Sequence, residues 1–190
     1  MKNKWNDLDA KAFIEKYKGV SEEIALRVYT SRLIGSDPSL VLHGGGNTSV
    51  KSSIQNKVNE EVDVLYVKGS GWDLDTLEPP GLPGVLLGHL QKLRGLDQLS
   101  DEDMVNEQRT HLLDASSPNP SVETLLHAFL PHKFIDHSHA DASLIIANQP
   151  DAEKICKKIY GDRIGIVSYI MPGFALAKAS AEVYEKNPNV

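Results

Sequence analysis

Residues 42–51 read LHGGGNTSVK, with three consecutive glycines ahead of an amide and two hydroxyl side chains. Glycine has no side chain to block the approach of another group, and successive backbone N–H groups in a concave turn bind anions. Apolar and β-branched residues stand on both sides of the glycines. The wider stretch, residues 39–52, is therefore predicted to form a strand, an anion-binding glycine turn and a second strand.

A further strand is predicted at residues 62–71, VDVLYVKGSG, where apolar residues alternate before a turn of small residues at Gly69, Ser70 and Gly71. Helical periodicity and capping residues predict helices on both sides of these units. The expected helices cover about residues 9–19, 21–35, 84–94, from Ser100 onward, 122–130, 151–160 and 174–187, and two more strands are expected at residues 134–140 and 164–170. Short strands that alternate with longer helices indicate a layered α/β fold.

The composition narrows the class of protein. The chain has 190 residues, 41% of them hydrophobic and 24% charged, which suits one globular domain over residues 1–190. A formal net charge of -6 without blocks of like charge excludes a general nucleic-acid or membrane-surface binder. Neither a signal-peptide pattern at the start nor an apolar run of about 18 residues occurs, so a cytoplasmic location is expected.

Two histidines are spaced for metal binding. His137 and His139 lie two apart on a predicted strand, which places both rings on one face with Cα atoms roughly 6.5–7 Å apart. Zinc binds imidazole nitrogen, and a catalytic zinc site usually has three protein ligands and one open position. His137 and His139 would then supply two of the three expected protein ligands. A metal-free pair of hydrogen-bonded histidines at a strand end is the alternative.

The sequence PNPSVETLLH, residues 118–127, adds a carboxylate, Glu123, in the first turn of a predicted helix. Beside a metal, such a carboxylate can remove a proton from a carbon next to a metal-bound carbonyl. The structural alternatives are also open: Glu123 as a helix-start residue stabilised by the dipole, Ser121 as an N-cap, and His127 as a partner on the same helix face.

Three segments resemble ordered motifs of the class II aldolase/adducin family. They are GGGNTSVK at residues 44–51, YVKGSGWDL at 66–74 and PSVETLLHAFLPHKFIDHSHADA at 120–142. The resemblance is closest to the aldolase part of bacterial rhamnulose-phosphate aldolase/dehydrogenase fusion proteins. It implies a three-layer α/β/α domain with a mostly antiparallel central sheet. It also implies a homo-oligomer, commonly a tetramer, with active sites near the subunit contacts.

The same resemblance assigns roles to individual residues. Glu123 would be the catalytic acid/base, and His137 and His139 would bind Zn²⁺. The phosphate of the substrate would be held by Gly46, Asn47, Ser70, Gly71 and Ser121. The implied reaction is zinc-dependent aldol cleavage of a ketose 1-phosphate, such as rhamnulose 1-phosphate, to dihydroxyacetone phosphate and an aldehyde.

One departure from the family pattern concerns the metal. The family's third zinc histidine comes late in its domain, whereas no histidine follows His139 here, so the chain is expected to lack the C-terminal end of that domain. Asp141 is a possible substitute ligand, although capping of a following helix fits it better. Val122 also replaces a frequent second serine. Two other functions stay open: a non-catalytic, adducin-like binding or assembly module, and a pentose-phosphate epimerase on the same fold.

Overall fold

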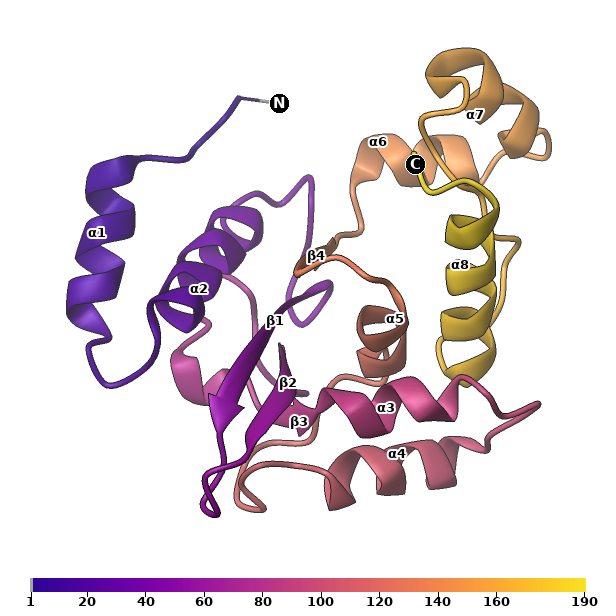
Figure 1. Cartoon of the computed structure of the whole chain (residues 1–190). Coiled ribbons are helices and arrows are strands. Elements are labelled where there is room, and N and C mark those ends of the chain that lie inside the picture. The colour runs from indigo at the N-terminus through magenta and orange to yellow at the C-terminus, as the bar shows by residue number, and fades with distance from the viewer. Residues whose placement is uncertain (1) are drawn as a thin grey trace.

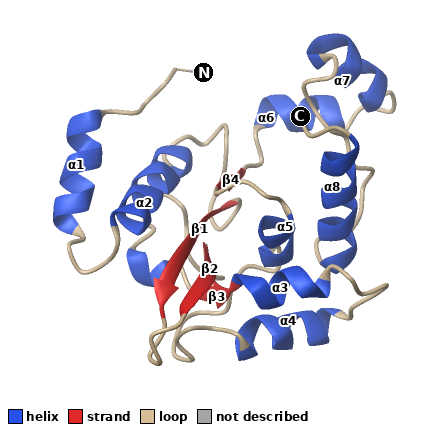
Figure 2. Cartoon of the chain, viewed as in Figure 1, coloured by secondary structure: helices blue, strands red, loops and turns tan. Residues whose placement is uncertain are grey.

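The computed structural model describes residues 2–190 as helices packed around one antiparallel sheet (Figures 1 and 2). The helices are α1 (Asp7–Lys16), α2 (Glu22–Gly35), the 3₁₀ turn η1 (Pro79–Gly81), α3 (Leu87–Leu93), α4 (Asp101–Thr110), α5 (Thr124–Phe129), α6 (Asp141–Ala147), α7 (Ala152–Tyr160) and α8 (Phe174–Lys186). The strands are β1 (Asn47–Gln55), β2 (Glu61–Val67), β3 (Gly84–Leu86) and β4 (Phe134–His137).

The sheet has the strand order β3-β2-β1-β4, and each neighbouring pair is antiparallel. β1 and β2 form a hairpin in which Gln55 is paired with Glu61. On its other side β1 pairs with β4, and Asn47 at the start of β1 lies opposite His137 at the end of β4. This register brings the glycine turn before β1 and the histidines of β4 to the same edge of the sheet.

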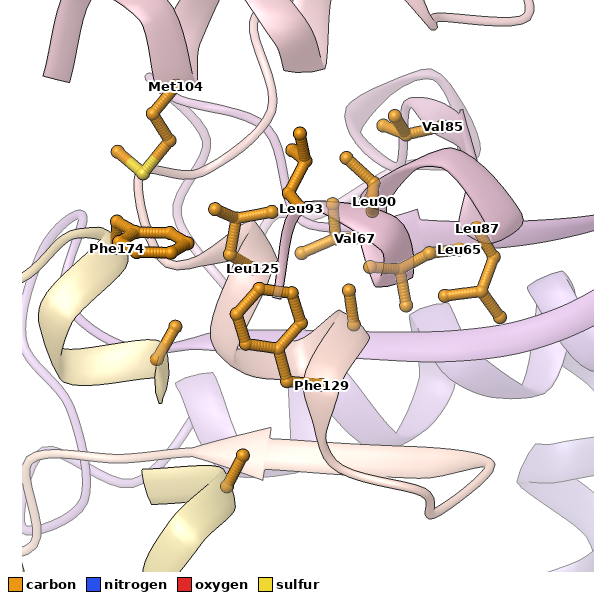
Figure 3. Packing of buried hydrophobic residues seen from close by; sticks show 13 residues of the cluster. Leu65, Val67, Val85, Leu87, Leu90, Leu93, Met104, Leu125, Phe129 and Phe174 are labelled. Atoms are coloured by element: carbon orange, nitrogen blue, oxygen red, sulfur yellow. The ribbon is translucent and has the colours of Figure 1, made fainter. Parts of the chain in front are cut away.

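Two hydrophobic clusters cover the two faces of the sheet. The first contains Leu65 and Val67 of β2 and joins them to α3, α4, α5 and α8 (Figure 3). The second is built from α2 and the loops at residues 41 and 74–82, with side chains of α1 and Tyr66 of β2 packed against it. Because neighbouring residues of a strand point to opposite faces, β2 contributes to both clusters. The predicted three-layer α/β/α fold with an antiparallel sheet is confirmed.

Capping residues define the helix starts that the sequence predicted. Ser21 caps α2 by accepting a hydrogen bond from the backbone N–H of Ile24, and Ser100 caps α4 by accepting one from Asp103. Both helices have acidic residues in the first turn, where the helix dipole favours negative charge. These two starts are confirmed.

Several predicted elements were wrong or incomplete. Residues 39–42 form turns instead of a strand, and residues 164–170 have no strand. The helix expected at residues 84–94 begins with the strand β3 before α3. β4 ends at His137 instead of continuing to residue 140, because the chain enters α6, a helix for which no range was predicted. Asp141 is the first residue of α6 but makes no side-chain capping bond there.

None of the helices within residues 2–190 is long and apolar enough to cross a membrane.

Candidate active site

Three parts of the fold meet around one cavity of about 360 Å³. They are the glycine turn before β1, the turn after β2, and the start of α5 together with the end of β4. The cavity is lined by Gly44, Gly45, Gly46, Asn47, Lys68, Gly69, Ser70, Gly71, Ser121, Val122, Glu123, His137, His139 and Pro172. The residues to which the family resemblance assigned catalysis, phosphate binding or metal binding therefore all line the same cavity, whereas Asp141, the possible substitute ligand, does not. A larger, shallow hollow of about 720 Å³ runs along α4, but its lining contains none of them.

A buried arginine holds β4 in position. Arg27 of α2 is 2% exposed and pairs with Asp136 of β4, with 2.6 Å between Nη2 and Oδ1. Its Nη1 also donates a hydrogen bond of 3.3 Å to the backbone carbonyl of Ser49 in β1. A buried guanidinium is costly unless it is paired, so these contacts fix the strand that carries His137 against its neighbour.

The glycine turn is tightly packed against the histidine segment. Gly46 has a positive φ of 69°, and a Cβ atom there would lie 2.7 Å from the backbone oxygen of His137. A Cβ atom on Gly45 would lie 3.1 Å from Nδ1 of His139. These two glycines are therefore required by the protein's own packing, and not only by the approach of a ligand. Gly44 has only an ordinary contact at 3.9 Å, with Asp73.

The turn after β2 is the more open side of the cavity. Gly71 has a φ of 85°, and no atom lies within 4 Å of the position of its missing Cβ. Lys68 is 4% exposed and donates from Nζ to the backbone carbonyl of Trp72 at 2.6 Å, which closes the turn. Burial lowers the pKa of Lys68, while the negative charges of Asp73 and Glu123 oppose that shift. Its ammonium brings positive charge to the cavity that also contains the Glu123 carboxylate.

The two histidines stay together although the strand ends between them. His137 closes β4, and His139 lies beyond it, where its backbone N–H donates to the carbonyl of Leu40 at 2.8 Å. The two ring centroids are 4.9 Å apart in an edge-to-face arrangement. Backbone bonds to residues 39 and 40, which the sequence placed in a strand, thus direct the second ring into the cavity.

Glu123 is the N-cap residue of α5 and is surrounded by polar groups. The side-chain amide of Asn47 donates to Oε2 of Glu123 at 2.6 Å and to Oγ of Ser121 at 3.1 Å. Nδ1 of His137 lies 2.9 Å from the same carboxylate oxygen. The ring is not aligned for a hydrogen bond to that oxygen, so this nitrogen is buried without a hydrogen-bond partner.

Buried hydrogen bonds through His127 fix the orientation of Asn47. His127 of α5 is fully buried, and its Nε2 lies against Oδ1 of Asn47 while its Nδ1 lies 2.7 Å from Oγ of Ser49. Because the amide oxygen can only accept, Nε2 of His127 must carry the proton, and Nδ1 accepts from the serine hydroxyl. The amide nitrogen of Asn47 is then directed at Glu123.

The surroundings of Glu123 and His127 hold the pKa of each side chain below its usual value. Burial raises the pKa of Glu123, but the adjacent His137 ring and the Asn47 amide outweigh burial, and the pKa lies below its usual value. Burial lowers the pKa of His127 to about 3, and the charge of His137 acts in the same direction. Glu123 is therefore a carboxylate at neutral pH, and His127 is uncharged.

Sequence reasoning did not identify two contributions to this site. It treated His127 as a structural partner of Glu123, whereas the ring reaches Asn47 and Ser49 across the α5–β1 contact. The assignment of Asn47 to the phosphate stays a prediction, and sequence reasoning did not foresee that the amide also contacts Glu123, Ser121 and His127. The spacing of His127, four residues after Glu123, could have indicated that this histidine positions the site. That inference also requires knowing that β1 lies next to α5.

Comparisons with known proteins agree with this architecture. Residues 25–190 match the family described as Class II Aldolase and Adducin N-terminal domain. The chain is 43% identical over 172 residues to the uncharacterized oxidoreductase YuxG of Bacillus subtilis (strain 168), a match that covers 90% of this chain and 24% of YuxG. The chain thus spans about a quarter of the length of that curated relative.

A solved structure supports the same relationship. It is the N-terminal class II aldolase domain of a conserved protein from Thermoplasma acidophilum, with 41% sequence identity and a TM-score of 0.86. The match covers 98% of this chain and 82% of that one. With the fold, the ordered motifs and the family match in agreement, the chain belongs to the class II aldolase and adducin N-terminal domain family.

Proposed function

We propose that this chain carries out zinc-dependent aldol cleavage of a ketose 1-phosphate, such as rhamnulose 1-phosphate, to dihydroxyacetone phosphate and an aldehyde. The observation that carries the proposal is the convergence of Glu123, His137 and His139 with two small-residue turns on one cavity. An aldolase needs a base beside a carbonyl-polarising metal and a subsite for the phosphate. A general aldolase-like function follows from the family, whereas the metal and the sugar are part of the proposal.

The residues present fit a zinc ion. The ring centroids of His137 and His139 are 4.9 Å apart. Nδ1 of His137 has no aligned hydrogen bond and lies 2.9 Å from the Glu123 carboxylate, so nitrogen and oxygen donors stand side by side in the cavity. Imidazole nitrogen is a preferred zinc ligand. When bound, zinc supplies a Lewis acid that polarises a substrate carbonyl.

Two histidines do not complete a usual catalytic zinc site, which has three protein ligands and an open position. The cavity lining supplies only these two imidazoles, with Glu123 nearby. We infer that a third protein ligand comes from outside this lining, and that zinc binds the 190-residue chain more weakly than a site with three histidines.

Glu123 acts as the base and acid in the proposed reaction. In the direction of synthesis, its ionised carboxylate removes a proton from the hydroxymethyl carbon of dihydroxyacetone phosphate, next to the carbonyl. In the direction of cleavage, the Glu123 carboxylate takes the proton of the C4 hydroxyl as the C3–C4 bond of the ketose breaks and the aldehyde C=O forms. The electron pair remains on C3, and the carboxyl group then gives that proton to C3. Asn47 positions the carboxylate through its hydrogen bond, and the lowered pKa of Glu123 keeps it ionised.

The phosphate is held by the open side of the cavity. Ser121 accepts hydrogen bonds through Oγ from the Asn47 amide and from the backbone N–H of Glu123, which leaves its own hydroxyl proton free to donate to a phosphate oxygen. Gly71 faces open space, so its backbone is accessible to a ligand. Gly46 and Ser70 line the same cavity, and Lys68 adds a positive charge.

Substrate assays on the zinc-loaded chain test the proposal. Rhamnulose, fuculose and ribulose phosphates are supplied in turn, and dihydroxyacetone phosphate is measured. Glu123→Gln keeps the shape of the side chain but removes the base, so we expect turnover to fall about 10²- to 10⁴-fold with zinc occupancy retained. Glu153→Gln on the exposed surface of α7 is the matched control. Equal turnover in wild type and Glu123→Gln would refute the assigned role.

The same assays separate the competing functions. Epimerisation of a pentose phosphate without release of dihydroxyacetone phosphate would favour the epimerase. Saturation with zinc and no reaction with any sugar phosphate would favour an adducin-like binding module. The word oxidoreductase in the name of YuxG is not carried over, because neither glycine turn of this chain has the G-x-G-x-x-G spacing of a dinucleotide site.

We also infer that the chain assembles as a homo-oligomer, with a tetramer as the expected form. Supporting this, large apolar side chains are exposed in and after α6: Ile145 is 66% exposed, Met171 69% and Tyr169 86%. Tyr169 and Met171 also contact each other, with 3.1 Å between Oη and Sδ, and exposed apolar patches commonly mark contact surfaces. Sedimentation velocity over a range of protein concentrations would measure the state, and a monomer at all concentrations would contradict the inference.

A further inference from the structure

Three side chains with metal-binding chemistry meet outside the aldolase cavity. His89 lies on α3, Glu107 lies on α4, and His111 caps the C-terminus of α4. Each offers one ligand atom, and these atoms all lie within 4.8 Å of one another. None of the three lines the cavity that holds Glu123.

Close contacts already join the three side chains. Nε2 of His89 lies 2.6 Å from Oε2 of Glu107, and Nδ1 of His111 lies 3.9 Å from the same oxygen. The rings of His89 and His111 stack with their centroids 3.3 Å apart and their planes 8° from parallel. The stack brings the two imidazoles together beside the Glu107 carboxylate.

One ring is also held in a form suited to metal binding. Nδ1 of His111 lies 2.8 Å from the backbone carbonyl of Glu107, and since a carbonyl can only accept, this nitrogen carries the proton. Nε2 of His111 then keeps a free lone pair. A ring N–H that donates to a backbone carbonyl is the usual support of a metal-ligating histidine.

We propose that His89, Glu107 and His111 form a second binding site for a divalent transition metal of the zinc type. Two imidazoles and one carboxylate are a ligand set that zinc accepts. The three side chains are partly exposed, so water can reach the metal and complete its coordination. Ligand atoms around a tetrahedral zinc ion lie about 3.3 Å apart, so the three ligand atoms would approach one another by up to roughly 1.5 Å. One imidazole would also turn out of the stack, because a metal ion lies in the plane of each ring that binds it.

The bound metal would link the two helices to the sheet. The backbone carbonyl of His111 accepts a hydrogen bond of 3.0 Å from Leu86 at the end of β3, and the backbone N–H of Leu113 donates to Gly84. α4 contributes only Met104 and Gln108 to the buried interior. A metal held between α3 and α4 therefore adds a cross-link where α4 has few buried contacts, and it stabilises the folded chain by binding only to it.

Metal titration of the tag-free 190-residue chain tests this site. The background variant carries His137→Asn and His139→Asn, which removes the imidazoles of the aldolase cavity. We expect this background to bind one equivalent of Co²⁺ or Zn²⁺ per chain, measured by the visible spectrum of cobalt and by calorimetry. His89→Gln or Glu107→Gln, each added to the background, is expected to weaken binding at least tenfold.

Two further measurements keep the result independent of folding and of the proposed aldolase. His132→Gln removes a histidine that contacts Tyr184 instead, and it should leave the metal affinity of the background unchanged. Zinc should raise the thermal unfolding midpoint of the background but not that of the His89→Gln or Glu107→Gln variants. Stoichiometric binding that is the same in all variants, or a background without stoichiometric binding, would overturn the second site while leaving the aldolase proposal untouched.

Discussion

Asn47 is the residue on which the proposed base depends. Its amide contacts Ser121, Glu123 and His127 at once, and it is only 4% exposed. A side chain with these partners has little freedom to turn toward a substrate. We therefore expect Asn47 to act on catalysis through the ionisation and position of Glu123.

The substitution Asn47→Asp tests this role. It replaces the amide donor at 2.6 Å from Glu123 with a second carboxylate, and two carboxylates that share a site raise the pKa of the pair. Since Glu123 must be ionised to act as a base, the acidic limb of the plot of kcat against pH should move to higher pH. An unchanged limb together with weaker phosphate binding would instead show that Asn47 contacts the substrate directly.

His127 makes a prediction about stability. In the unfolded chain an ordinary histidine binds a proton near pH 6.5, whereas in the folded protein burial lowers the pKa of His127 to about 3. Between these values the unfolded state binds more protons, so stability falls as pH falls. The loss from this one group is at most about 1.4 kcal/mol per pH unit.

Urea unfolding at pH 5–6.5 measures this effect in a range above the ordinary pKa values of carboxylates. Wild type should lose stability across that range, and His127→Gln, although less stable at pH 7, should have a flatter profile. The control His132→Gln should keep the wild-type slope. Parallel profiles for wild type and His127→Gln would show that His127 is not held neutral.

At the scale of elements, the glycine turn and β4 form one unit. The turn packs on the backbone of His137, and the register of β1 with β4 places Asn47 opposite that histidine. A change in the turn is therefore expected to move the histidines, even when no ligand is bound.

Three alanine substitutions separate packing from backbone strain. Gly46→Ala meets both a positive φ and the oxygen of His137, whereas Gly71→Ala meets only a positive φ, and Gly19→Ala meets neither. We expect Gly71→Ala to cost about 1–2 kcal/mol of unfolding free energy and Gly46→Ala to cost more. Gly46→Ala should also weaken zinc binding. Equal losses of stability and unchanged zinc affinity would contradict the packing of the turn on β4.

The elements that sequence reasoning predicted correctly have local causes. α2 follows from Ser21 and its acidic first turn, and β2 follows from a run of β-branched, apolar and aromatic residues before a small-residue turn. The two wrongly predicted strands, at residues 39–42 and 164–170, have β-rich compositions but no ladder partner in the described chain. Strand formation depends on a neighbouring strand, and that neighbour is not visible in a local window.

In the candidate site, too, features that local sequence predicts differ from features that depend on distant contacts. Spacing and family resemblance named Glu123, His137 and His139, and the structure places them at one cavity. The hydrogen bonds of His127 depend on a contact between α5 and β1, which are far apart in the sequence. The group at His89, Glu107 and His111 likewise depends on how α3 lies against α4. Neither arrangement has a sequence spacing of its own.

At the scale of the whole molecule, three layers bring the Glu123 carboxylate, two imidazoles and two glycine turns to one edge of the sheet. We propose that this edge removes a proton from the carbon next to a carbonyl when zinc is bound. This step does not depend on which aldehyde the enzyme uses, so it can be measured without knowing the complete sugar substrate.

The most direct measurement is exchange of the hydroxymethyl hydrogen of dihydroxyacetone phosphate with D₂O, followed by proton NMR at saturating Zn²⁺. We predict stereospecific exchange at one of the two hydrogens, which is lost on chelation of zinc, in Glu123→Gln and in the His137→Asn/His139→Asn variant. It should persist in His89→Gln. Absence of exchange by the zinc-loaded wild-type chain, or exchange that Glu123→Gln leaves intact, would contradict the account.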